Sequence, residues 1–392
     1  MQSEVDVVIA GGGAVGSACA YFLRDLGFPG SIMVVEPDPS YRAAASTRSA
    51  SSIRRQFSTP VNIALSMFGM EFLKAAPRRL ARDGSHPTMS LVESSYLYLA
   101  TELGRAALER QVAFQQGLAV AVTLRDRAAL VRRYPWLETS DLAAGADTSE
   151  GEGWFDGYAL LSALRAANER SGIGYVRDRV IGFDASAEGL LVGVRLEAAG
   201  RVGCRHAVDA AGTHSRELAA TVGVELPVFA RKRTVFVFTC PHKIPRSPLV
   251  IDPTGLWFRP EGDRWLCGPP AEPDPDVSEE DFEVDHALFE ERAWPILAHR
   301  VPAFEEVRMT SAWAGHYDYN VFDQNAFIGP VPGMPNLLLA CGFSGHGLQH
   351  APGIGRGLAE FICFGGYRSI DLAALSYERY LAHAPLREGN VI

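Results

Sequence analysis

Short apolar runs separated by glycine clusters shape the start of the chain. Val5–Ala10 is a compact run of mostly β-branched residues, which is typical of a buried parallel strand. Ser17–Leu26 has the spacing of a helix that Gly27 ends, and Ser31–Glu36 is a second apolar run. These segments predict one β-α-β unit at the N-terminus.

The same reading extends to the rest of the chain. Apolar periodicity predicts helices at 61–80, 160–171 and 352–364, and strands within 174–211 and at 234–239, 255–259 and 336–341. Residues 43–60 are polar, without periodicity, and predict a long functional loop. The acidic stretch Asp274–Asp285 follows several prolines and is expected to be exposed.

This order of elements predicts an α/β protein. We expect a Rossmann-type nucleotide-binding domain built from three separated pieces, with an inserted, sheet-based α+β substrate domain. The first domain is assigned to residues 1–80, 145–220 and 325–392, and the second to 81–144 and 221–324.

The first glycine cluster lies between the predicted strand and helix. Gly11, Gly13 and Gly16 form a G-x-G-x-x-G motif, in which the glycines permit a tight turn, close approach of a pyrophosphate and helix packing. Ala14 and Val15 lie between these glycines, just before the helix, whose free N–H groups attract phosphate. Glu36 ends the second strand, where a carboxylate can accept the ribose hydroxyls.

This unit predicts dinucleotide binding without separating FAD from NAD. Ser46, Thr47 and Arg48 follow the second strand and are candidate phosphate contacts, although a solvated loop is the alternative.

A second glycine-rich turn, Gly342–Gly347, follows the strand predicted at 336–341. One interpretation is a packing turn that uses glycine for its backbone freedom. The other is a helix N-terminus aimed at the negative charge of a reduced flavin. The residues alone leave both open.

Composition excludes several functional classes. The chain has 392 residues and a net charge of −9, which argues against a general nucleic-acid binder. Its six cysteines form no C-x-x-C pair, so no metal site is predicted. No run is long enough to span a bilayer and no signal-peptide layout is present, so we expect a cytoplasmic protein.

Taken together, the motifs resemble the D-amino acid oxidase superfamily, in particular its sarcosine and glycine oxidase branch. The similar segments are the G-x-G-x-x-G with Glu36, Asp209–Gly212, and GFSGHG at 342–347. A closer similarity is to the FAD-dependent oxidoreductase domain proteins, a family that includes a mitochondrial complex I assembly factor. That similarity rests on Gln56–Ile63, Tyr317–Asn325, Gly342–Arg356 and Asn390–Ile392.

The resemblance implies an FAD cofactor and oxidation of a small amino acid. It implies that Val180 lies at the adenine and that Ala211 and Gly212 lie where the chain passes the cofactor. It also implies that Arg54 binds the substrate carboxylate through a bidentate guanidinium contact. The second turn then contacts the flavin through Gly342, Gly345, His346, Gly347 and Leu348.

Three departures from the sarcosine oxidase pattern affect chemistry. The cysteine that attaches FAD covalently there is replaced by Gly315 or His316, so FAD is expected to be non-covalent. A substrate-binding lysine is replaced by Gln349, and the lysine that helps to activate oxygen falls at or near Leu266. The resemblance therefore leaves an oxidase and a dehydrogenase open, and an oxidase is the expectation.

The implied reaction is oxidation of a C–N bond to an imine that water hydrolyses, with hydrogen peroxide released if molecular oxygen is the acceptor. His316, His346 and His350 are candidate proton carriers, since histidine titrates near neutral pH, although a structural role is the alternative for each. Arg259, Tyr317 and Gln349 are candidate substrate contacts.

The substrate class and the rival functions complete the prediction. Arg55, Arg231, Lys232, Arg233 and Arg259 lie on segments that suit an anionic, possibly dicarboxylate, amino acid of the N-substituted glycine type. The alternatives are a flavoprotein that acts in assembly or binding with slow turnover, and an amine dehydrogenase that feeds a quinone or a carrier.

Overall fold

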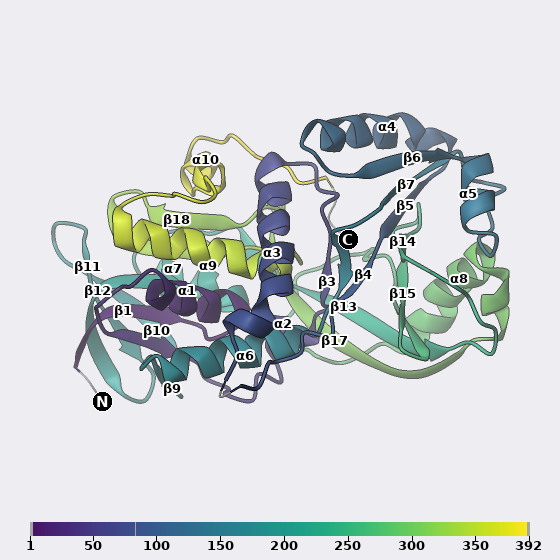
Figure 1. The fold of residues 1–392 in the computed structure, drawn as a ribbon. Coiled ribbons are helices and arrows are strands. Elements are labelled where there is room, and N and C mark those ends of the chain that lie inside the picture. The colour runs from purple at the N-terminus through teal and green to yellow at the C-terminus, as the bar shows by residue number, and fades with distance from the viewer. Residues whose placement is uncertain (1–2, 83, 390–392) are drawn as a thin grey trace.

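The computed structural model describes residues 3–82 and 84–389. The segment Asn390–Ile392, which contributed to the resemblance, lies outside them. Two large sheets lie side by side, with helix α3 (Pro60–Arg79) running between them (Figure 1). The prediction of a Rossmann-type α/β protein is confirmed.

The first sheet has a parallel centre made from distant parts of the chain. Strand β1 pairs in parallel with β2 and β12, β2 pairs with β9, and β12 pairs with β19. Strands β10, β11 and β18 add antiparallel edges. The strands are β1 Glu4–Ala10, β2 Ile32–Val35, β9 Gly174–Val176, β10 Val180–Ala185, β11 Leu191–Leu196, β12 Gly200–Asp209, β18 Phe327–Val331 and β19 Met334–Cys341.

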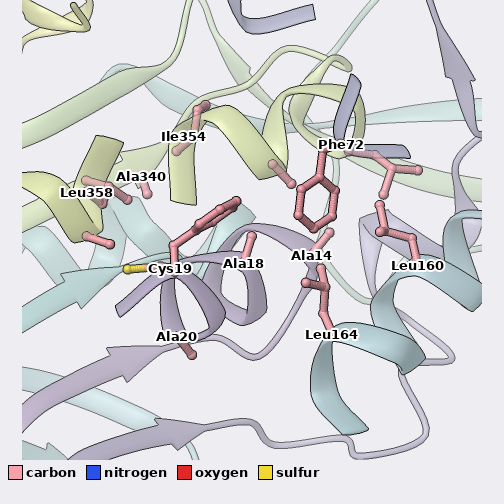
Figure 2. Close-up of a cluster of buried hydrophobic side chains, with 14 of the residues drawn as sticks. Ala14, Ala18, Cys19, Ala20, Phe72, Leu160, Leu164, Ala340, Ile354 and Leu358 are labelled. Carbon is pink, nitrogen blue, oxygen red and sulfur yellow. The ribbon is translucent and has the colours of Figure 1, made fainter. Parts of the chain in front are cut away.

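Helices bury the central strands because their small residues allow close approach. Helix α1 (Ala14–Asp25) packs against α9 (Gly347–Phe364) so tightly that a Cβ at Gly355 would lie 2.5 Å from the carbonyl carbon of Ala18. Ala18 and Ile354 lie together in this core (Figure 2), with Leu160 and Leu164 of α6 (Gly157–Arg170) at its side.

The second sheet has the order β17-β13-β16-β15-β14-β5-β7-β6 and is mostly antiparallel. Its strands are β5 Tyr96–Ala100, β6 Val122–Asp126, β7 Ala144–Thr148, β13 Val228–Thr239, β14 Leu249–Ile251, β15 Trp257–Glu261, β16 Arg264–Gly268 and β17 Arg308–Asn320. The helices beside it are α4 Glu102–Gly117, α5 Arg127–Arg133, η2 Phe289–Ala293, α8 Trp294–Arg300 and η3 Pro302–Glu306.

The two faces of this sheet differ because side chains alternate along each strand. Phe236 and Phe238 of β13 point into an aromatic core on one face. Arg231 and Arg233 lie on the opposite face, paired in register with Tyr317 and Gly315 of β17. This second face carries charged and aromatic residues toward the middle of the molecule.

Short elements complete the fold. A small third sheet has the order β3-β8-β4. The remaining elements are α2 Ala45–Arg48, β3 Ser52–Ile53, β4 Val92–Ser94, β8 Glu152–Trp154, η1 Gly212–His214, α7 Ser215–Ala220, η4 Ala373–Leu375 and α10 Glu378–Leu381. The loop predicted at 43–60 therefore contains one helical turn and one short strand.

Several predicted boundaries were wrong. Helix α1 begins at Ala14 rather than Ser17, because Gly13 takes the N-cap position. Helix α9 begins at Gly347, five residues before the predicted start, and contains Pro352. Strand β13 begins at Val228 rather than Thr234, and β17 was missed. The division into domains stays a prediction.

Candidate FAD and substrate site

The turn after β1 is shaped by backbone contacts that exclude side chains. Gly11 has φ +97°, and a Cβ there would lie 2.2 Å from the carbonyl oxygen of Ala210. A Cβ at Gly16 would lie 2.0 Å from the Gly11 oxygen, so Gly16 serves helix packing. The turn thus brings the N-terminus of α1 beside the end of β12, where Ala211 and Gly212 follow.

Glu36 holds this turn from the end of β2. Its Oε2 accepts a hydrogen bond from the N–H of Gly12 at 2.9 Å, and its Oε1 accepts one from the N–H of Asp38 at 2.9 Å. Burial raises the pKa of the Glu36 carboxyl, and these two hydrogen bonds oppose that shift. Its side chain therefore both fixes the turn and borders the space beside it.

The three residues predicted to contact phosphate have different environments in the structure. Ser46 Oγ accepts a hydrogen bond from the Ala14 N–H at 3.1 Å, at the start of α1. Thr47 Oγ1 instead donates to the Ala44 carbonyl at 2.9 Å and does not line the cavity. Arg48 Nη1 donates to the Ala314 carbonyl at 2.7 Å, and its guanidinium lies 4.3 Å from the centre of the Phe282 ring.

One cavity of about 490 Å³ joins the two glycine-rich turns. It extends from the first turn, past Val180 and Ala211, to the start of α9, and the second sheet forms its far wall. The predicted cofactor contacts that line it are Gly11, Gly13, Ala14, Val15, Glu36, Ser46, Arg48, Val180, Ala211, Gly212, Gly345, Gly347 and Leu348. Gly16, Thr47, Gly342 and His346 do not line it.

The second turn is tied to β17 by Asp318. The N–H of Gly342 donates to Asp318 Oδ2 at 2.7 Å, and the N–H of Ser344 donates to the Asp318 carbonyl at 3.1 Å. Gly345 has φ +95°, and a Cβ there would lie 2.4 Å from the Tyr317 ring. The start of α9 is therefore held against the wall that Tyr317 forms.

The candidate histidines occupy two different environments. His346 and His350 are buried side by side, with ring centres 5.2 Å apart, and do not line the cavity. Burial lowers the pKa of His346 far below its usual value and that of His350 to about 3, so both rings are neutral at neutral pH. His316 lines the cavity, and burial lowers its pKa also.

Arg54 lies behind the cavity wall, buried against Phe57. Its guanidinium is 4.4 Å from the Phe57 ring centre, and its backbone N–H donates to Gln349 Oε1 at 2.9 Å. Burial opposes its charge, but Tyr98, Tyr96, Glu388 and Tyr317 together raise its pKa. Arg54 is therefore a permanent cation beside Tyr317, and its contact with substrate stays a prediction.

The Arg259 guanidinium makes its contacts with other residues of the chain. It donates to the Ala50 carbonyl at 2.8 Å, forms an ion pair with Glu261 and stacks 5.0 Å from the Trp154 ring centre. It does not line the cavity. These contacts fix the loop before β3, and a substrate contact at Arg259 stays a prediction.

Sequence reasoning assigned no site role to several residues of the cavity wall, namely Trp257, Phe282, His214 and Glu279, and the last two are in contact with each other. Arg233, which was expected to suit an anionic substrate, lines the cavity too. The alternation of Arg231 and Arg233 along β13 was the signal that could have placed these arginines on one face. Glu279 and Phe282 belong to the acidic stretch expected to be exposed, which has no buried residue and also covers the cavity.

The geometry fits a bound dinucleotide. A glycine turn at a helix N-terminus offers backbone donors to a pyrophosphate, and the cavity continues toward a second such turn. Within residues 3–82 and 84–389, no cluster of three or more His, Cys, Asp or Glu side chains is placed to hold a metal ion. Of the helices in that same part of the chain, none has the length and apolar character to cross a membrane.

Comparison with known proteins agrees with this geometry. The family model described as FAD dependent oxidoreductase (DAO) matches residues 6–361. The FAD-dependent oxidoreductase domain-containing protein 1 of Xenopus laevis is 36% identical, over 99% of this chain and 85% of its own length. The 4-methylaminobutanoate oxidase (formaldehyde-forming) of Paenarthrobacter nicotinovorans is 27% identical, over 98% of this chain and 46% of its own length.

Solved structures share the fold across the whole chain. L-proline dehydrogenase from P. horikoshii has a TM-score of 0.86 at 20% identity, covering 98% of this chain and 100% of its own. Glycine oxidase from Geobacillus kaustophilus has a TM-score of 0.81 at 22% identity, covering 96% and 98%. The resemblance inferred from the motifs is confirmed: the chain belongs to the DAO family of FAD dependent oxidoreductases, and FAD is its cofactor.

Proposed function

We propose that this protein oxidises the C–N bond of a small amino acid, of the N-substituted glycine type, to an imine. The observation that carries the proposal is a cavity that continues from the dinucleotide turn to a wall of Tyr317, with Arg54 behind that wall and Arg233 on it. A wall of this charge suits the carboxylate of an amino acid.

FAD, when bound, supplies the acceptor for the hydride that leaves the carbon beside nitrogen. Arg54 orients the substrate carboxylate through its charge, and Gln349 fixes Arg54 through its backbone N–H. His316 is the candidate proton carrier that lines the cavity, and its lowered pKa keeps the ring neutral at neutral pH. Water then splits the imine into an amine and a carbonyl compound.

The family comparison supports amine chemistry without naming a substrate. The relative from Paenarthrobacter nicotinovorans is named for oxidation of 4-methylaminobutanoate with release of formaldehyde. An N-methyl amino acid and an N-substituted glycine present the same reacting unit, a C–H bond beside a secondary amine, together with a carboxylate.

The test is anaerobic bleaching of the flavin absorbance in the holoprotein. Sarcosine, dimethylglycine, N-carboxymethyl amino acids, proline and glycine are compared. We expect rapid bleaching by at least one N-substituted glycine. We also expect Arg54→Ala to slow bleaching at subsaturating substrate by about tenfold or more, because the positive charge that attracts the substrate carboxylate is lost.

Arg55→Ala is the matched control, because it removes the same side chain at the next position. Equal effects of the two substitutions would exclude the assignment of Arg54. Stoichiometric FAD without bleaching by any compound would exclude the oxidation and favour an assembly or binding role.

The electron acceptor is a separate question, and the residue at position 266 bears on it. Leu266 is buried with Val235 and Val237, where the resemblance places a lysine that helps to activate oxygen. An aliphatic residue there favours a dehydrogenase that feeds a quinone or carrier. Stopped-flow mixing of the reduced protein with air-saturated buffer separates the two: reoxidation within seconds supports an oxidase, and slower reoxidation supports a dehydrogenase.

A further inference from the structure

An acidic segment, residues 269–285, covers one side of the cavity. It contains no lysine, arginine or histidine, and its acidic residues are Glu272, Asp274, Asp276, Glu279, Glu280, Asp281, Glu283 and Asp285. It lies against the basic part of β13. Arg231 Nη2 is 3.0 Å from Asp276, Lys232 Nζ is 2.6 Å from Asp281, and Arg233 Nη1 is 2.6 Å from Asp274.

The pair between Arg233 and Asp274 differs from the other two. It is bidentate, with Nη1 at 2.6 Å from Oδ1 and Nη2 at 2.9 Å from Oδ2. A guanidinium binds a free carboxylate in this same geometry. Arg233 lines the cavity, whereas Arg231 and Lys232 do not. Asp274 does not itself line the cavity, but it places a carboxylate of the chain on a cation of the cavity wall.

Arg233 also has binding capacity that Asp274 does not use. Its Nε is buried and has no hydrogen-bond partner among the described residues. Its guanidinium lies 4.9 Å from the ring centre of Tyr317, which forms the wall beside the start of α9. A buried donor without a partner is costly, and a ligand in the cavity can satisfy it.

The acidic segment is held by contacts that can be exchanged. No helix or strand is assigned within residues 269–285, and its side chains in the three ion pairs are 27%, 52% and 34% exposed for Asp274, Asp276 and Asp281. The pairs of Asp276 and Asp281, with that exposure, contribute little to stability, so the bidentate pair between Arg233 and Asp274 is the main contact that a ligand must exchange. Segments with few backbone hydrogen bonds open at low free-energy cost.

We infer that Asp274 occupies a carboxylate subsite, and that Arg233 binds the second carboxylate of a dicarboxylate amino acid when the segment moves aside. Tyr317 is near both cations: its ring centre lies 4.9 Å from the Arg233 guanidinium, and it is among the groups that raise the pKa of Arg54. A substrate with a carboxylate at each end of an amine spans such a pair. The part of this inference that calls the ligand a substrate rests on the proposed function. The existence of a carboxylate subsite at Arg233 does not.

The test measures binding without turnover. Malonate and acetate are titrated into the oxidised, FAD-saturated protein by isothermal titration calorimetry. Asp274→Asn removes the internal competitor, and we expect it to tighten malonate binding by about tenfold or more with a smaller effect on acetate. Arg233→Met removes the receptor and is expected to abolish the preference for malonate.

Asp276→Asn is the matched control, since it removes the same charge from the same segment at a pair outside the cavity wall. Equal tightening by Asp276→Asn and Asp274→Asn would overturn the inference, because general charge relief would explain both. No tightening by Asp274→Asn would overturn it too, as would malonate preference retained in Arg233→Met. Because malonate is not oxidised, these outcomes are independent of whether any amine bleaches the flavin.

Discussion

Asp209 is a buried carboxyl at the end of β12, beside the turn that receives the dinucleotide. It accepts hydrogen bonds from Ser215 Oγ at 2.7 Å and from the Ala211 N–H at 3.2 Å. Its Oδ2 is buried without a partner among the described residues, and burial raises its pKa to about 7. The protonated form therefore suits the folded state better than the charged form.

The sign of the pH dependence follows from this shift. Between the unfolded pKa of about 3.9 and the folded value, the folded protein holds a proton that the unfolded chain releases, so stability falls as the pH rises. We predict that the unfolding free energy of Asp209→Asn, taken relative to that of the wild type, rises by about 2–3 kcal/mol from pH 5 to pH 8. Urea unfolding of both proteins at the two pH values measures this difference, and a pH-independent difference would contradict it.

Sequence reasoning at the level of single residues picked out cavity residues where their spacing along the chain is regular. Gly11, Gly13 and Glu36 lie at the cavity because a strand, a turn and a second strand fix their positions. Arg233 could only be grouped with the other cations expected to suit an anionic substrate, because its place on the wall depends on the register between β13 and β17, strands separated by about seventy residues. Distant register has no local signal in one sequence.

Helix α9 allows a comparison between two glycines with left-handed backbone. Gly345 precedes the helix with φ +95°, and its Cβ would meet the Tyr317 ring at 2.4 Å. Gly365 caps the other end with φ +73°, and nothing lies within 4 Å of its Cβ position. The two positions therefore share backbone strain and differ in contact with the cavity wall.

We predict that Gly365→Ala costs about 1 kcal/mol of unfolding free energy and leaves FAD affinity unchanged. Gly345→Ala should cost about 1–3 kcal/mol more, because the methyl group displaces Tyr317, and it should weaken FAD binding. Urea unfolding of the apoproteins and quenching of flavin fluorescence measure the two effects. Equal behaviour of both variants would show that the Gly345–Tyr317 contact has no role in the site.

Element prediction failed where pairing, rather than local pattern, decides the structure. The apolar runs of β1, β2 and β19 were predicted because strands buried on both faces are apolar throughout. Strand β17 contains His316, Asp318 and Asn320 and was missed, since these polar side chains are satisfied by the acidic segment, by the second turn and by the loop that follows the strand. Such partners are known only once the fold is formed.

At the scale of the molecule, the cavity is the place where the two sheets meet. Its first wall is built by the turns after β1 and β12, and its opposite wall by β13, β16 and β17. The acidic segment closes one side through ion pairs with β13, and His214 of η1 reaches across to Glu279. A ligand that fills the cavity therefore contacts both halves of the fold and couples FAD binding to the stability of the whole chain.

This coupling predicts the result of removing FAD. Gly315 is packed against Arg48, where its Cβ would lie 2.9 Å from the Arg48 Cβ, and His316 donates to the Asp281 carbonyl at 2.8 Å, so neither position offers a thiol to attach the flavin. Acid precipitation should release all FAD into the supernatant. Adding FAD back at about a hundred times its dissociation constant should stabilise the apoprotein by about 2.7 kcal/mol in urea unfolding, since a ligand that binds only the folded state adds its binding free energy. NAD at the same concentration is the control and should give no gain. Flavin retained in the pellet would contradict non-covalent binding, and equal stabilisation by NAD would show that the cavity does not select the flavin.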